Sequence, residues 1–208
     1  LDLLGERKES RLEAAVGMMK ANYILNNFQG AFANALTVLE SQNVDNKIKN
    51  EANLIAARSN LKLGSPTEAQ IYLNKAIESG SPSQAAESSY LLAKIQFDAD
   101  SLDSAEAMVF HIVENYQSQS FWLGKSLLLL SDVYMARGDL FQAKATVNSI
   151  IDNYTKEDEV KEEARKKLEQ ITEIESQPEA EEQPDIEIDF GDPEIPNQNQ
   201  VAPQDSLN

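Results

Sequence analysis

The sequence predicts an all-α protein built as a solenoid of stacked helix pairs. Three observations lead to this prediction: a pattern that recurs every 36 to 38 residues, an amphipathic helical spacing inside each copy, and turn residues between the two helices of each copy. A fixed period in this range is typical of proteins in which each repeat packs only against its neighbours.

The repeat is marked by one alanine in each of four copies: Ala31, Ala69, Ala105 and Ala143. Apolar residues follow that alanine at four, seven and eight positions, as Val109, Ile112 and Val113 follow Ala105. This spacing places the side chains on one side of a helix, so each alanine lies early in the second helix of a pair. Twelve positions earlier lie residues of the first helices, in order Met19, Ala57, Ala93 and Ser131. The small side chains among them let the paired helices approach closely.

Turn residues separate the two helices of every copy, and we expect turns near residues 26–28, 63–66, 99–102 and 137–139. Gly64 and Gly138 accept the left-handed backbone conformation that ends many helices, and asparagine also tolerates it. Ser, Asn or Asp then caps the next helix, and Pro66 suits a first helical position. We therefore expect nearly all of residues 6–175 to be helical. A strand of more than four residues in that range would contradict the prediction.

Residues 155–176 follow the four copies, which occupy residues 1–154, and predict a single closing helix. Thr155 and Asp158 resemble a capping box at its start. The apolar residues form one narrow stripe: Val160, Ala164, Leu168 and Ile171. A charged helix with one buried side suits the end of a solenoid, which needs a polar outer surface.

Residues 177–208 form an acidic tail with nine Asp or Glu residues and no Lys or Arg. We expect this tail to be disordered, because its charge, its prolines and its few apolar residues cannot offset the entropy of ordering. From Asp185 to Phe190 acidic and apolar residues alternate, and the apolar ones are Ile186, Ile188 and Phe190. Two interpretations stay open: a solvated tail that aids solubility, or a segment that docks in a groove of a partner or of this chain.

The composition narrows the function classes. The 208 residues are 41% hydrophobic and carry a net charge of −17, so a core can form but nucleic acid and anionic membranes are repelled. Cysteine is absent, which excludes disulfides and thiolate chemistry. No apolar run is longer than that of Leu127 to Leu130, which is far too short to span a membrane. Residues 1–5 contain neither an initiator Met nor an export signal, so we expect a processed form or a piece of a longer protein.

No residue pattern predicts an enzyme, a cofactor or a metal. His111 is the only histidine and has no identifiable partner for acid–base chemistry, so we assign it no role. Asp98, Asp100 and Asp103 cluster at one turn, but Asp103 stands where a calcium-binding EF-hand requires glycine, and helix capping is favoured. The eight glycines form no phosphate-binding motif.

The fourth copy resembles the tetratricopeptide repeat (TPR), with the pattern Leu127-x-x-Leu130-Ser131-x-x-Tyr134-x-x-x-Gly138 followed by Ala143. The resemblance extends over about residues 6–154 and implies a right-handed superhelix of helix pairs. The sequence departs from the family in its period, which exceeds the usual ~34 residues, and in lacking the closing proline. The aromatic position of the family holds a polar residue in the other copies: Asn22, Asn60 and Gln96.

The chain also resembles the C-terminal part of large bacterial envelope TPR proteins. This second resemblance implies partners in an assembly complex and a periplasmic or outer-membrane-associated location. The cytoplasm is the alternative location.

The TPR resemblance further implies a concave groove lined by the first helices. The residues that it places in the groove are Lys20, Arg58, Lys94 and Asp132, with neighbouring candidates at Leu54, Tyr90, Lys125 and Leu128. Three successive cations predict a basic clamp for the carboxylates of an extended peptide, which includes the tail of this chain. The alternative is that these long side chains cover apolar surface and pair with Glu13, Glu51 or Glu87.

These features predict a non-enzymatic scaffold or adaptor that binds proteins or peptides through its groove. The alternative function is a structural subunit that stacks end to end with flanking repeats or with copies of itself. An exposed apolar face on the helix predicted at residues 6–26 would favour stacking. For Phe121 and Trp122, core packing is favoured over a role as binding hot spots.

Overall fold

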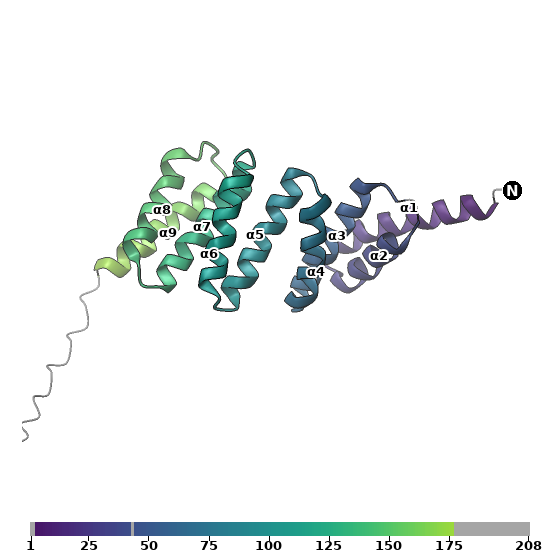
Figure 1. Ribbon diagram of the computed structural model, residues 1–208, viewed down its shortest axis with the longest axis horizontal. Coiled ribbons are helices and arrows are strands. Elements are labelled where there is room, and N and C mark those ends of the chain that lie inside the picture. The colour runs from purple at the N-terminus through teal and green to yellow at the C-terminus, as the bar shows by residue number, and fades with distance from the viewer. Residues whose placement is uncertain (1–2, 43, 177–208) are drawn as a thin grey trace, which may run out of the picture. The chain divides into compact units, whose positions relative to one another are not determined.

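The computed structural model describes residues 3–42 and 44–176 (Figure 1). This part of the chain contains nine α-helices and no strand. The helices are α1 Leu3–Ile24, α2 Phe28–Glu40, α3 Asn46–Lys62, α4 Pro66–Ser79, α5 Pro82–Asp98, α6 Leu102–Asn115, α7 Ser120–Ala136, α8 Leu140–Asn153 and α9 Glu159–Ser176. The predicted disorder of the tail and its candidate docking residues, Ile186, Ile188 and Phe190, lie outside the described residues.

The helices form four antiparallel pairs, α1/α2, α3/α4, α5/α6 and α7/α8, and α9 packs against α7 and α8 (Figure 1). The second helix of each pair also packs against the first helix of the next pair, as α2 does against α3. First helices contact each other along the series α1, α3, α5, α7 and α9. The prediction of an all-α solenoid is therefore confirmed.

The four turns inside the pairs lie where the sequence predicts them. Asn26, Gly64, Asp100 and Gly138 have φ angles of 59°, 76°, 57° and 77°, which is the left-handed region. Glycine has no Cβ to clash in this conformation, and short side chains such as Asn and Asp tolerate it. Each of these residues lies two positions after the last residue of the first helix of its pair, in the turn that reverses the chain direction.

The capping predictions are correct for only part of the turns. Asn27 accepts a hydrogen bond from the Gly30 amide at 3.1 Å, and Asp139 accepts one from the Gln142 amide at 2.9 Å. Ser65 and Ser101 precede α4 and α6 without making such a bond, contrary to expectation. At Ser65 the next residue is Pro66, whose ring fixes the first helical φ without help from a cap.

The register of the repeat is confirmed by burial. The four repeat alanines are each fully buried at the helix crossings: Ala31, Ala69, Ala105 and Ala143. Met19, Ala57 and Ala93 are also fully buried in the facing first helices. In the fourth pair the Ser131 hydroxyl donates a hydrogen bond to the Ala143 carbonyl at 3.2 Å, so the two marker residues meet directly.

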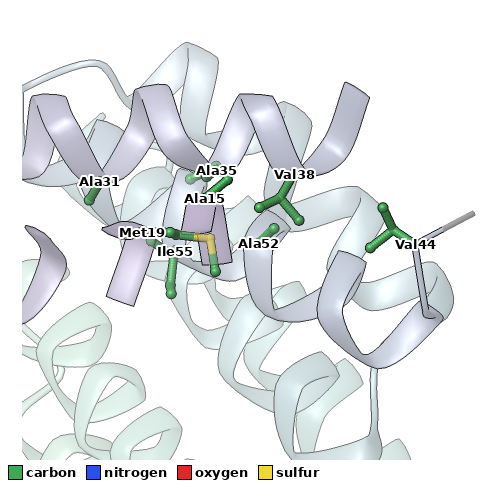
Figure 2. Close-up of a cluster of buried hydrophobic side chains, with 9 residues drawn as sticks. Ala15, Met19, Ala31, Ala35, Val38, Val44, Ala52 and Ile55 are labelled. Atoms are coloured by element: carbon green, nitrogen blue, oxygen red, sulfur yellow. The ribbon is translucent and has the colours of Figure 1, made fainter. Parts of the chain in front are cut away.

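The core consists of apolar clusters between consecutive helices. Figure 2 shows the first of them, in which Met19 of α1 lies between Ala31 and Ala35 of α2 and Ile55 of α3. Alanine dominates the crossing points, so the helix backbones approach closely and Met19 fills the remaining space.

The start of the closing helix corrects one prediction. α9 begins at Glu159, and its first turn is capped by Asp158, which accepts a hydrogen bond from the Val160 amide at 3.0 Å. Thr155 lies outside the helix, so no capping box spans these residues. Asp158 is held in place because its other carboxylate oxygen accepts a 2.7 Å bond from the Tyr154 hydroxyl. Burial and this bond raise the pKa of Tyr154 to about 12.

The predicted apolar stripe of α9 faces α7 and α8. Val160, Ala164 and Ile171 are fully buried, and Leu168 is half-buried. Gly124 of α7 permits the close approach, because a Cβ at that position would lie 2.6 Å from Cγ1 of Val160. No helix in the described part of the chain is long and apolar enough to cross a membrane.

Candidate functional site

The predicted groove residues lie on the first helices, on a surface that we call the first-helix face and define by α1, α3, α5, α7 and α9. Ion pairs join neighbouring helices across this face. Lys20 of α1 binds Glu51 of α3 at 2.8 Å, and Arg58 of α3 binds Glu87 of α5. These are pairs that the alternative interpretation of the cations predicts.

The Arg58–Glu87 pair is the most buried charged contact on this face. Glu87 is 6% exposed and accepts a hydrogen bond from Nε of Arg58 at 2.5 Å. The guanidinium carbon also lies 6.0 Å from the ring centroid of Tyr23, within reach of a cation–π contact. Burial raises the pKa of Glu87, and the charge and hydrogen bond of Arg58 oppose that rise. The Arg58 guanidinium is therefore held by the buried carboxylate of Glu87.

The C-terminal half of the face is also occupied by internal contacts. Lys125 of α7 binds Glu163 of α9 at 2.8 Å, and Asp132 of α7 binds Lys167 of α9. Between α5 and α7 the link is aromatic, with the rings of Tyr90 and Trp122 5.6 Å apart. Burial raises the pKa of the Tyr90 phenol.

The remaining predicted residues divide between core and surface. Leu54 and Leu128 are 6% and 4% exposed and belong to core clusters, so they offer little surface to a ligand. Phe121 is half-buried and packs against the cluster around α7, α8 and α9, as expected. Trp122 is half-buried between Phe121 and Tyr90.

The ion pairs favour the alternative interpretation of the cations over a basic clamp. The ion pairs of the predicted groove residues involve five cations: Lys20, Arg58, Lys94, Lys125 and Lys167. Their five partners are Glu51, Glu87, Asp98, Glu163 and Asp132. In four of these pairs the partners lie 29 to 38 positions apart in the sequence and on adjacent first helices, whereas Lys94 and Asp98 lie one turn apart on α5.

An opening lies on this face between α1, α3 and α5, and we call it the α3–α5 cleft. It has a volume of about 390 Å³ and is lined by Tyr23, Arg58, Leu61, Lys62, Glu87, Leu91, Lys94 and Asp98. Of the neighbouring first helices, α3 and α5 make the least contact, which leaves this space open. The cleft combines apolar side chains with two exposed lysines, Lys62 and Lys94.

Sequence reasoning identified Arg58 and Lys94 in this cleft but missed Tyr23, Leu61 and Lys62. A signal for two of them was present. Leu61 and Lys62 lie three and four positions after Arg58, which places all three on one side of α3. Tyr23 could not be found in this way, because its approach depends on how α1 packs against α3.

The acidic cluster and the histidine make local contacts. Asp98 pairs with Lys94, and Asp103 pairs with Arg137 at 2.6 Å. His111 is exposed, with its Nδ1 3.1 Å from the Asn115 amide nitrogen. Among the residues that the structure describes, no group of three metal-binding side chains is gathered.

The fold and the first-helix face together define a helical-repeat solenoid whose pairs are consistent with TPR-like repeats. Two solved structures of MamA share this fold. One, of the MamA protein, matches with a TM-score of 0.57 and 17% identity over 80% of this chain and 93% of the other. The second matches with a TM-score of 0.52 and 17% identity over 76% of this chain and 94% of the other. No family model and no curated protein matches the sequence.

Replacing Arg58 by methionine is expected to lower the free energy of unfolding by about 1–2 kcal/mol at pH 7, because Glu87 is left buried without its partner. The value is modest because the Arg58 side chain is 32% exposed and solvent screens part of the charge. The loss should be smaller at pH 4. Without Arg58 the folded-state pKa of Glu87 rises further above its ordinary value of 4.5, so stability is lost as the pH rises from 4.5.

Urea denaturation at pH 4 and pH 7 measures this difference. Lys20→Met is the matched control, since both side chains of the Lys20–Glu51 pair are more than a third exposed. It should change stability by less than about 0.5 kcal/mol at either pH. Equal effects of the two substitutions would show that Arg58 does not compensate a buried charge.

Proposed function

We propose that this chain is a non-enzymatic scaffold that binds other proteins by holding an extended segment in the α3–α5 cleft. Carboxylates next to apolar side chains are the features that the cleft recognises. The proposal is supported by the helical-repeat fold, whose stacked pairs present extended surfaces for binding. The observation that carries it is the pairing of an apolar lining with two lysines that are free to change partners.

The two lysines differ from Arg58 in this respect. With the described residues Lys62 forms no ion pair, and Lys94 pairs only with Asp98, one turn further along α5. The Lys94 and Asp98 side chains are 49% and 57% exposed, and such a pair contributes little to stability. A ligand carboxylate can therefore replace Asp98 at low cost.

The apolar lining determines the rest of the specificity. Tyr23, Leu61 and Leu91 come from three different helices, so a side chain inserted among them contacts α1, α3 and α5 together. The volume of about 390 Å³ lies at the lower end of the range for ligand pockets, about 300–1,000 Å³. This is room for a few side chains of an extended segment, and not for a folded domain.

A segment of this chain supplies a suitable probe. Residues 183–192 contain the alternation of acidic and apolar residues around Ile186, Ile188 and Phe190. We expect a fluorescein-labelled peptide of this sequence to bind a chain ending at Ser176, which retains the whole compact unit of nine helices. Fluorescence anisotropy measures the affinity, which should fall with added salt because exposed charges are screened.

The double substitution Lys62→Glu and Lys94→Glu is expected to weaken binding at least about tenfold, or about 1.4 kcal/mol. Lys47→Glu is the control, because Lys47 is exposed on α3 but lies outside the cleft. Unchanged binding by the double variant, or no binding of the peptide to the parent chain, would contradict the proposal. That the natural partners belong to a bacterial envelope assembly is a further part of the proposal, supported by the sequence resemblance alone.

A further inference from the structure

The outer side of α1 carries an apolar surface that the described residues leave uncovered. Its members are Ala14, Gly17, Met18 and Ala21, and we call it the α1 outer face. Met18 is 51% exposed, and a Cβ built on Gly17 would meet nothing within 4 Å. Ile24 and Leu25, next to this face at the end of the helix, are 77% and 75% exposed.

The repeat register identifies what this face corresponds to. Shifts of 38, 74 and 112 residues map its four positions onto α3, α5 and α7. The corresponding residues are Ala52, Ile55, Ala56 and Ser59 in α3, Ser88, Leu91, Leu92 and Ile95 in α5, and Ser126, Leu129, Leu130 and Val133 in α7. Eleven of these twelve are buried, and Leu91 is half-buried. The same side of a first helix is thus covered three times and exposed once.

The cover in each internal case is the preceding helix pair. Ala52 and Ala56 of α3 pack in one cluster with Ala35 and Val38 of α2. In α7, Leu129 and Leu130 pack with Val109 of α6 and with Ala93 of α5. The α1 outer face therefore has the composition and the register of a repeat-to-repeat interface that lacks one partner.

The opposite end of the array is built differently. There α9 covers the last pair with its apolar stripe and presents charged residues on its other sides, including the exposed pair Glu162–Lys166 at 2.6 Å. A solenoid end that faces water needs such a polar surface. The α1 outer face has no charged residue among its four members, and exposed apolar surface of this kind marks an interaction site.

We propose that the α1 outer face binds a two-helix repeat unit, which packs against α1 as the α1/α2 pair packs against α3. The second helix of that unit would pack along Ala14, Met18 and Ala21, and its first helix would contact the end of α1. A second copy of this chain is a poorer occupant. Within the described residues, one end of that copy presents the charged outer side of α9 and the other presents another α1. Neither end offers the helix pair that covers the first helix in the internal repeats. This inference does not depend on the α3–α5 cleft. A negative result for one proposal therefore does not contradict the other.

The test supplies the missing unit as a graft. A duplicate of residues 44–81, which contains α3 and α4, is placed directly before Lys8, the position that corresponds to Pro82 in the repeat register. The rest of the chain to Asn208 is kept. We expect the melting temperature to rise by at least about 4 °C, a size typical of 1–2 kcal/mol in a chain of this length. Amide exchange in α1 residues 12–24 should slow at least about tenfold.

Met18→Glu provides the matched variant, because it introduces a charge that is solvated in the parent chain but buried in the grafted one. In the parent chain it should leave the melting temperature and α1 exchange unchanged. In the grafted chain, Met18→Glu should abolish both the rise in melting temperature and the slowing of amide exchange in α1. Unaltered α1 exchange after grafting would overturn the proposal. So would a parent chain that forms dimers in sedimentation equilibrium and loses them with Met18→Glu, since a second copy would then be the occupant.

Discussion

Replacing Ile171 by alanine is expected to lower the free energy of unfolding by about 2–5 kcal/mol, the usual cost of truncating a fully buried aliphatic side chain. Ile171 is 0% exposed and lies in a cluster with Ala164, Val147 and Ile150. The cavity would form where α9 meets the fourth pair. Because a solenoid is stabilised mainly by contacts between neighbouring elements, loss of this contact also exposes the apolar side of the fourth pair.

The same helix provides a matched control. Ile174 lies three residues further along α9 and is 42% exposed, so Ile174→Ala removes the same atoms from a largely solvated position. It should change the free energy of unfolding by less than about 1 kcal/mol. Urea denaturation followed by circular dichroism at 222 nm measures both variants. Similar losses for the two would show that α9 does not close the solenoid through its predicted stripe.

Replacing Ala143 by leucine is expected to cost about 1–3 kcal/mol, because the larger side chain overpacks a helix crossing. Ala143 is 0% exposed, and its carbonyl accepts a hydrogen bond from the Ser131 hydroxyl of α7. There is no space for three additional carbon atoms unless α7 and α8 move apart. Such a movement would also weaken the hydrogen bond between the two helices.

Ala145 is the control for this substitution, since it lies two residues away on the exposed side of α8. Ala145→Leu adds the same atoms to a helix surface, where leucine is well tolerated, and should change stability by less than about 0.5 kcal/mol. Thermal unfolding distinguishes the two. An unchanged melting temperature for Ala143→Leu would contradict the repeat register that the buried alanines define.

Features that depend on short-range backbone chemistry were predicted well. The turns that follow the first helices contain Asn26, Gly64, Asp100 and Gly138, which tolerate positive φ, a property of the single residue. The helix-cap predictions were less reliable at Ser65 and at Thr155. A side-chain hydroxyl accepts a hydrogen bond from a backbone amide of the first turn only if the preceding segment enters the helix in a suitable conformation. The residue type does not specify that conformation.

The candidate site shows the same division. The sequence places Lys20, Arg58 and Lys94 at equivalent positions of successive first helices, and this follows from the repeat alone. Their electrostatic state does not follow from it. The carboxylate that neutralises Arg58 comes from Glu87, 29 residues away, and becomes a partner only when α5 is docked beside α3.

The sequence by itself therefore determined the elements, the repeat register and the side of each helix that is buried, because helical periodicity and turn preferences act within a few residues. Only the tertiary structure decided which charges are compensated, where the α3–α5 cleft opens and that the described residues leave the outer face of α1 uncovered. Each of these depends on distances between helices in different repeats. Those distances are set by packing across the whole interface, to which many side chains contribute and which no single position in the sequence encodes.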